Sequence, residues 1–271
     1  MKQPFFIIGG MLFFFTIFMA TVFPYLHHID VNTVYAPLQE PGTDHWLGTN
    51  HAGFDMLSLL VKGLQSSLYV GFTAGIMATI IGTFLGIYAG FSGGWRDDAI
   101  NMVTNLIIVI PQFVLLVLIS TSLHAGQRSL SLIAVIIAVT SWTWSARAVR
   151  AQASSIRGSS HITLAKVNGC TTFAIVFWHI LPYLYSYVFM VFTIQMSSAI
   201  ISESCISMIG LGPYDTVSLG TILNDAIRYG TLRDGAWWAF IPATFLISVI
   251  VFSFYIINTS MEGVFNPRLR K

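Results

Sequence analysis

The residues of this chain that could do chemistry are few, and most of them lie in one basic segment between two long apolar stretches. Arg147, Arg150, Arg157 and Lys166 occur there among small and hydroxyl residues, and the segment ends at His179-Ile180-Leu181-Pro182. Basic side chains near a membrane attract anionic headgroups and acidic surfaces. If the flanking stretches cross a membrane, this segment can touch a soluble partner in the cytoplasm.

A single acid, Glu203, closes the long charge-free run 167–202. An acid this close to a membrane is a candidate functional residue because its charge is costly there. Two roles remain open for it, an anchor for the segment that follows and a contact to a substrate on its path. Ser207, Gly210 and Gly212 follow it and belong to the same candidate set.

Four histidines, His27, His28, His45 and His51, raise the question of a metal site, but their spacing fits no defined ligand pattern. The chain has no Gly-Lys-Ser/Thr loop that would hold phosphates. It also shows no set of nucleophile, base and orienting residue. We therefore predict no metal ligand, no cofactor and no catalytic residue.

The composition indicates that lipid surrounds most of the chain. Of the 271 residues, 55% are hydrophobic and only 9% are charged, whereas soluble domains carry about 25% charged residues. The net charge of +2 is too small to indicate a nucleic-acid partner. Lysine, arginine, aspartate and glutamate are absent from the runs 3–29, 63–95, 99–127, 129–146, 167–202 and 235–261.

Each of these runs is long enough to cross a membrane, since a helix needs roughly 20 apolar residues to span the hydrocarbon. We predict an all-α membrane protein with six spans, at residues 4–26, 66–91, 99–123, 130–149, 172–201 and 237–258. Pro111 should kink the third span. Cys170 and Cys205 lie at opposite ends of the fifth span, which makes a disulfide between them geometrically implausible.

The distribution of lysine and arginine predicts the orientation. With both termini inside, nine of these residues face the cytoplasm and four face outward, in accord with the positive-inside rule. The first run could also be a cleaved signal peptide. However, its basic region is only Lys2 and its apolar stretch is long, which favours an uncleaved first span.

Two short amphipathic segments flank the spans. Residues 53–64 place apolar side chains on one helical face, so they either lie flat on the outer leaflet or lead into the second span. In the basic segment, Ser159-Ser160 can cap a helix that stops at Gly169. That helix has only about two turns and is too short to be stable alone. It needs either a partner surface or the membrane face.

The basic segment resembles the cytoplasmic "EAA" loop of bacterial ABC importer permeases. In this chain the series reads Thr163-Leu164-Ala165, then Gly169, then Ile180-Leu181-Pro182, and thirteen positions separate Gly169 from Pro182 as in that family. His179 stands where the peptide-type permeases often have histidine.

Further blocks resemble the C-type permease subunit of dipeptide, oligopeptide and nickel importers. The outer signature of that subunit is matched by Gly48, Thr49, Asn50, Gly53 and Asp55. The remaining blocks, in chain order, are Ser67-Leu68, Gly86, Gly90, Gly93-Gly94 with Asp97, Pro111, Trp142, Ala146-Arg147, Val149-Arg150, Glu203 with Ser207 and Gly210-Leu211-Gly212, and Asn266-Pro267-Arg268-Leu269-Arg270.

The chain departs from the family pattern at four of these positions. Thr163 replaces the usual acid of the loop and Leu164 occupies its second position, while Asn50 and Phe54 replace an aspartate and an arginine of the outer signature. Without an acid at position 163, one expected charge contact to an ATPase is lost. Shape and apolar contacts would then carry more of the docking.

The resemblance implies a type I ABC importer permease in a bacterial inner membrane, working with a homologous permease subunit, two ATPase subunits and an extracytoplasmic substrate-binding protein. It implies short peptides or, as an alternative, nickel or metal chelates as substrates. The ATPase-coupling residues it implies are Thr163, Leu164, Ala165, Lys166, Gly169, Cys170 and Pro182.

The resemblance also divides the chain into an N-terminal span with its outer segment (1–65), a transmembrane core (66–258) and a cytoplasmic tail (259–271). Two rival classes have less support. A stand-alone secondary transporter would need paired ionisable residues within its spans, and an intramembrane enzyme would need candidate catalytic residues.

Overall fold

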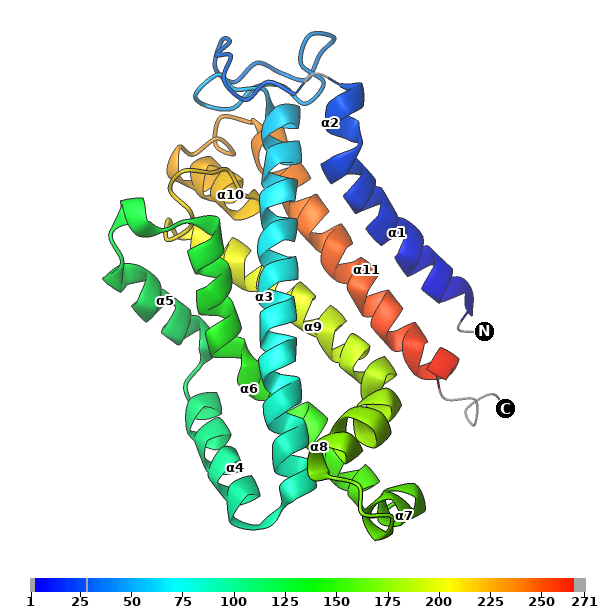
Figure 1. Ribbon diagram of the computed structural model, residues 1–271. Coiled ribbons are helices and arrows are strands. Elements are labelled where there is room, and N and C mark those ends of the chain that lie inside the picture. Colours follow the sequence, from blue (N-terminus) through cyan, green and yellow to red (C-terminus); the bar gives the residue numbers. More distant parts are fainter. Residues whose placement is uncertain (1–2, 28, 266–271) are drawn as a thin grey trace.

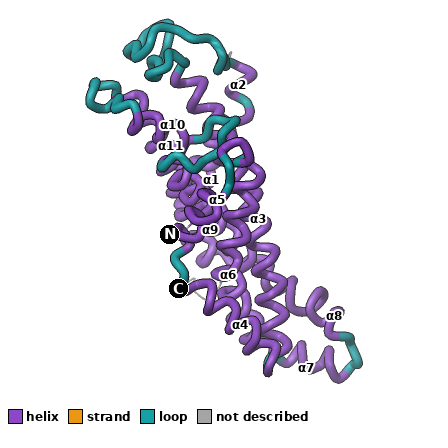
Figure 2. The backbone as a smooth tube through the Cα atoms, turned by 90° about the vertical axis from the view of Figure 1, so that its left-hand side faces the viewer, coloured by secondary structure: helices purple, strands orange, loops and turns teal. Residues whose placement is uncertain are grey.

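The computed structural model describes residues 3–27 and 29–265, and this part of the chain is an elongated helical bundle without strands (Figure 1). The long connection after α2 (Phe23–Leu26) and helix α10 (Leu219–Arg228) lie at one end, which we call the loop end. Helix α7 (Ser160–Val167) lies at the opposite end, which we call the α7 end (Figure 2). Within these helices the backbone N–H and C=O groups are hydrogen-bonded to one another, as a lipid environment requires.

Five described segments are long and apolar enough to cross a membrane. They are α1 (Gln3–Thr21), α3 (Met56–Ser92), α6 (Leu130–Arg157), the segment Thr172–Met208 and the segment Trp237–Met261, which lies largely in α11 (Ile241–Phe265). Helices α4 (Gly94–Val109) and α5 (Gln112–Ser122) meet the same criteria together and form a bent pair. The six predicted spans therefore correspond to five continuous segments and one broken one.

The break in the third span is much larger than the predicted kink. The axes of α4 and α5 differ by 77°, because Ile110 and Pro111 both adopt extended backbone angles. The ring of a proline disfavours the helical conformation of the residue before it. Pro111 therefore ends one helix and starts another.

The second span begins at Met56, ten residues before the predicted start. The Asp55 side chain accepts a hydrogen bond from the Ser58 N–H and caps the helix. Leu57, Val61 and Leu64, which form the predicted apolar face, are buried in the bundle. The prediction that residues 53–64 could lie flat on the membrane surface is wrong, because these apolar side chains face the bundle core rather than lipid.

Other helix ends also differ from the prediction. Helix α6 continues to Arg157, beyond the predicted end at residue 149, so Arg150 is helical rather than part of a loop. The fifth span consists of α8 (Thr172–Ile175), a π-helical turn (Val176–Ile180) and α9 (Leu181–Met208). Because α9 extends to Met208, Glu203 and Ser207 lie inside a helix and not in the outer segment where the sequence placed them.

Helix α3 is the central element because glycines let two neighbours approach it closely. A Cβ atom added at Gly86 or Gly90 would lie 2.6 Å from the carbonyl oxygen of Ala146 or Arg150 on α6. Gly75, nearer the loop end, would place a Cβ 3.1 Å from the Met196 backbone on α9. Small residues at helix interfaces are typical of packing in membranes, where close approach supplies the attraction.

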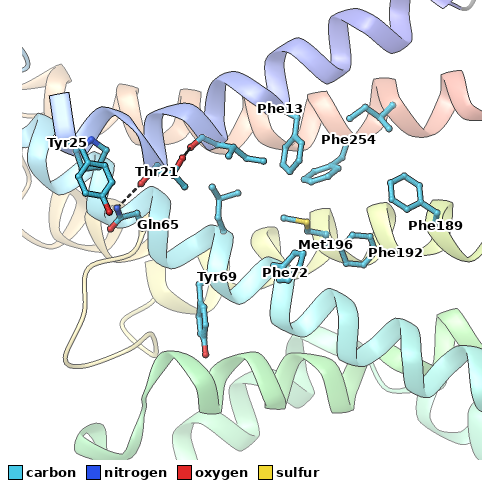
Figure 3. A pocket seen from close by; sticks show the side chains of 15 residues that line it. Phe13, Thr21, Tyr25, Gln65, Tyr69, Phe72, Phe189, Phe192, Met196 and Phe254 are labelled. Carbon is cyan, nitrogen blue, oxygen red and sulfur yellow. Dashed lines mark hydrogen bonds between the residues drawn. The ribbon is translucent and has the colours of Figure 1, made fainter. Parts of the chain in front are cut away.

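Helix α1 is attached mainly along α11. The Phe13 and Phe254 rings lie 4.6 Å apart between these two helices. On the side of α3 and α9, an apolar groove of about 740 Å³ separates α1 from the bundle (Figure 3). The Gln65 side chain donates a 2.7 Å hydrogen bond to the Ala20 carbonyl at one end of this groove. Among the described residues, no charged side chain lines it.

Candidate functional site

Helix α7 forms where the sequence predicts it, but its start differs from the predicted cap. The Ser159 Oγ donates to the Ile156 carbonyl at 2.7 Å and accepts no backbone N–H of the helix. Its end follows the prediction. Gly169 has φ +75°, its N–H donates to the Lys166 carbonyl at 3.0 Å, and the Cys170 N–H donates to the Ala165 carbonyl at 3.1 Å. These two bonds are those of a Schellman C-cap.

The bundle itself supplies the partner surface that this short helix needs. Ile162 and Ala165 are buried in a cluster with Phe91 of α3 and with Val149 and Ala153 of α6. The opposite face is open, with Leu164 62% and Val167 79% exposed. Helix α7 is thus fixed on one side and presents apolar side chains on the other.

The residues implied in ATPase coupling differ in their exposure. Ala165 is buried and Cys170 is half-buried, whereas Thr163, Leu164, Lys166, Gly169 and Pro182 are exposed. The Lys166 ammonium lies 5.0 Å from the centre of the Phe91 ring. The structure therefore makes Ala165 an anchor of α7 and leaves the exposed residues free to meet a partner.

The outer signature folds into one compact loop in front of α3. The Thr49 hydroxyl donates to the Ala36 carbonyl at 2.7 Å and accepts the Gln39 N–H at 2.8 Å. The indole N–H of Trp238 donates to the Thr49 carbonyl at 3.0 Å. Gly48, with φ +65°, passes so close to Trp238 that an added Cβ would lie 2.9 Å from the indole nitrogen.

Asn50 accepts hydrogen bonds that an aspartate, the residue of the family pattern, could also accept. Its Oδ1 accepts the N–H groups of Ala52 and Phe54, each at 2.9 Å. Only an acceptor oxygen is required, which an amide or a carboxylate provides equally. Gly53 makes the turn with φ +84°, and Asp55 both caps α3 and lies 3.0 Å from the His45 ring nitrogen.

Glu203 is fully buried and connects three helices. Its Oε1 accepts the Ser207 hydroxyl at 2.7 Å, and its Oε2 accepts the Ser67 hydroxyl of α3 at 3.0 Å. The Ser67 Oγ in turn accepts the N–H of Leu219, the first residue of α10, at 3.2 Å. One carboxyl group therefore joins α9 to α3 directly and to α10 through a single hydroxyl.

Two glycines let the chain pack closely against Ser207, next to this carboxyl. An added Cβ would lie 2.7 Å from the Ser207 Cβ at Gly212 and 2.6 Å from it at Gly220. Gly210, with φ +84°, ends α9. We call Ser67, Glu203, Ser207, Gly212 and Gly220 the Glu203 corner. The sequence pattern contained Glu203, Ser207 and Gly212 but did not identify Gly220, and it held Ser67 only as one position of a longer block.

The three of these histidines that the structure describes do not gather into one site. His45 meets Asp55, His27 stacks on Trp46 with ring centres 5.0 Å apart, and His28 lies outside the described residues. His51 stacks on Tyr229 of the α10 end at 3.6 Å. Within residues 3–27 and 29–265, no three His, Cys, Asp or Glu side chains are grouped so that they could hold a metal ion.

His51 and Asp225 line a hollow of about 360 Å³ between the signature loop and α10. Burial lowers the pKa of His51, and the nearby Asp225 carboxylate opposes this shift. Burial raises the pKa of Asp225, opposed by the charges of His51 and Arg228. Both shifts disfavour the charged forms because the hollow is partly removed from water.

The fold and these sites define a class: a multi-pass helical membrane protein whose described bundle exposes a fixed short helix at one end and a structured loop at the other. Residues 82–271 match the family described as "Binding-protein-dependent transport system inner membrane component", and the chain belongs to that family.

Curated relatives cover most of the chain. The oligopeptide transport system permease protein OppC of Mycobacterium tuberculosis (strain H37Rv) is 32% identical over 219 residues, 80% of this chain and 74% of the relative. The dipeptide transport system permease protein DppC of Bacillus subtilis (strain 168) is 28% identical over 268 residues, 97% of this chain and 82% of the relative.

A solved structure shares the fold. A chain of the MetNI methionine ABC transporter, in an inward-facing conformation, superposes with a TM-score of 0.59 at 21% identity, covering 76% of this chain and 97% of that chain. The fold is therefore that of an ABC importer permease. The chain is a permease of the family that includes these peptide importers, and these findings favour that reading over a stand-alone secondary transporter.

Proposed function

We propose that this chain is one of two homologous permease subunits that together enclose a path for short peptides, with nickel or metal chelates as the alternative cargo. The observation that carries the proposal is helix α7, which is fixed by Ile162 and Ala165 and presents Leu164 and Val167 outward in a chain whose relatives are named as oligopeptide and dipeptide permeases.

The open face of α7 is the proposed docking site for an ATPase subunit. Thr163 brings no charge to this face, so Leu164, Val167 and the fit of the helix in a groove supply the contact. A helix buried on one side transmits a push to the elements it packs against, here the ends of α3 and α6. Closure of the ATPases around ATP would thus move the bundle at its α7 end.

The loop end is the proposed docking region for an extracytoplasmic binding protein. The Glu203 corner supports α10 from inside this region. Because the Glu203 side chain is fully buried and both its oxygens accept serine hydroxyls, we favour the anchoring role over contact with cargo. The proposed orientation has both termini in the cytoplasm of a bacterial cell, with α7 beside the ATPases and the loop end outside.

A test of this function uses the cells that produce the chain. Deletion of its gene should abolish uptake of a radiolabelled dipeptide, and the restored gene should recover it. Leu164→Cys should cross-link to an ATPase subunit in membranes, while Cys placed at the buried Ala165 should not. Unchanged dipeptide uptake with lost ⁶³Ni²⁺ uptake would favour the metal alternative. Proton-driven peptide flux by the purified chain alone in liposomes would overturn the proposal.

A further inference from the structure

A polar contact joins the broken span to the helix that leads into α7. The Nε and Nη2 atoms of Arg150 on α6 donate to the two carboxylate oxygens of Asp97 on α4, at 2.5 and 2.8 Å. Asn101 also donates to Asp97, at 2.8 Å. Further along the same helices, the Arg147 Nη2 donates to the Asn105 Oδ1 at 2.6 Å. Two arginines one helical turn apart therefore hold one face of α4.

Little else holds α4 to the bundle. Among the residues of α4, only Thr104 is buried, whereas α6 has twelve buried residues and packs along α3. The side chains of Asp97 and Arg150 are themselves only 17% and 33% exposed. A two-pronged, charge-assisted contact of this kind fixes both distance and orientation. The turn from α3 at Gly93 and these polar contacts to α6 thus set the position of α4.

The far end of α4 is not continuous with α5, since the chain bends by 77° at Pro111. The near end belongs to the same region as α7. Helix α6 ends at Arg157, two residues separate it from α7, and Val149 and Ala153 of α6 share the cluster that buries Ile162 and Ala165. A displacement of α7 therefore reaches Arg150 through packed side chains.

We propose that the Asp97–Arg150 pair is a strut that makes the inner half of the broken span follow α7, so that both residues act as positioning residues for transport. This inference rests on the proposed docking of an ATPase at α7. Without the strut, α7 and α6 would still move with the ATPases, but α4 would not follow. ATP hydrolysis would then continue without substrate movement.

The pair can be tested in the complete importer, reconstituted with its ATPases and binding protein. Asp97→Asn and Arg150→Gln should each lower dipeptide uptake at least tenfold while basal ATP hydrolysis and the cross-link from Leu164→Cys to the ATPase persist. The exchanged pair, Asp97→Arg with Arg150→Asp, should regain a substantial part of the uptake. The matched control is Asp98→Asn, an exposed neighbouring acid without a hydrogen bond to Arg150, which should transport normally.

A second variant guards against misfolding. In the double variant Asp97→Cys, Arg150→Cys, uptake should be low with free thiols and should rise several-fold after a short bismaleimide joins them, in the same preparation. Wild-type uptake by Asp97→Asn, or equal uptake before and after the thiols are joined, would overturn the strut. Loss of the cross-link at position 164 in the otherwise wild-type importer would instead count against the proposed ATPase docking.

Discussion

Ser67 and Glu203 stand 136 positions apart in the chain, yet the Ser67 hydroxyl donates to the Glu203 carboxyl at 3.0 Å inside the bundle. The same Ser67 oxygen accepts the first N–H of α10. This arrangement satisfies an acid and a helix start together, at a depth where neither could turn to water. It gives a physical reason for a glutamate, two serines and two glycines lying together at this corner.

Removal of the Glu203 carboxyl should destabilise the loop end. In Glu203→Ala the hydroxyls of Ser67 and Ser207 lose their acceptor, and an unsatisfied buried polar group costs about 1–3 kcal/mol. Glu203→Gln keeps one acceptor oxygen and should lose less. Thermal unfolding of the purified chain in detergent measures both. Glu40→Ala removes an exposed acid and should leave the melting temperature unchanged. Equal melting of Glu203→Ala and the wild type would contradict the anchoring role.

Two glycines near α7 provide a matched pair. Gly169→Ala places a side chain at φ +75°, where an L-residue costs roughly 1–2 kcal/mol, and should loosen the end of α7. Gly158→Ala lies at φ −87° with open space around its Cβ and should be neutral. Hydrogen exchange of the α7 amides, followed by mass spectrometry, should rise only in Gly169→Ala. The same exchange in both variants would argue against the left-handed cap as the determinant.

The two faces of α7 should respond differently to substitution. Ala165→Phe overfills the cluster around Phe91 and Val149, which costs about 1–3 kcal/mol, and it should lower the melting temperature and uptake together. Leu164→Ala changes only the exposed face, so melting should stay constant while co-purification with the ATPase subunit falls. If Leu164→Ala melted early and Ala165→Phe did not, the assignment of the faces would be reversed.

Acidification should weaken the loop end through His51. Because burial lowers the His51 pKa in the fold, the unfolded chain binds the proton more readily. The contribution of this residue is therefore complete above its ordinary value of about 6.5 and is lost as the pH falls below it. Asp225 has the opposite sign, since its raised pKa makes the fold gain as that acid is protonated at lower pH.

The measurement is the change in melting temperature between pH 7.5 and 5.5. His51→Phe keeps a ring that can stack on Tyr229 and cannot be protonated, so this variant should lose less stability over the interval than the wild type. His124→Phe serves as a control at an exposed histidine of the α5–α6 connection. An identical pH dependence in wild type and His51→Phe would exclude His51 as the responsible group.

Several elements of this fold can be predicted from local sequence alone. Its charge-free runs predict the membrane-spanning segments, and Gly169 after a short amphipathic run predicts the end of α7. These features are local, because the length of an apolar run and the backbone preference of a glycine do not depend on distant residues. The start of α3 does not follow from the sequence because residues 53–64 look amphipathic, and only the burial of Leu57, Val61 and Leu64 shows which way that face points.

The sequence by itself therefore determined the class of protein, the approximate spans and the presence of a short helix between α6 and α8. Only the tertiary structure decided that Pro111 breaks its span by 77°, that Ala165 faces inward, and that Asp97 meets Arg150 and Ser67 meets Glu203. The physical reason is that such pairings depend on how glycine-lined helices fit together, and residues 53 or 136 positions apart become neighbours only when that packing is formed.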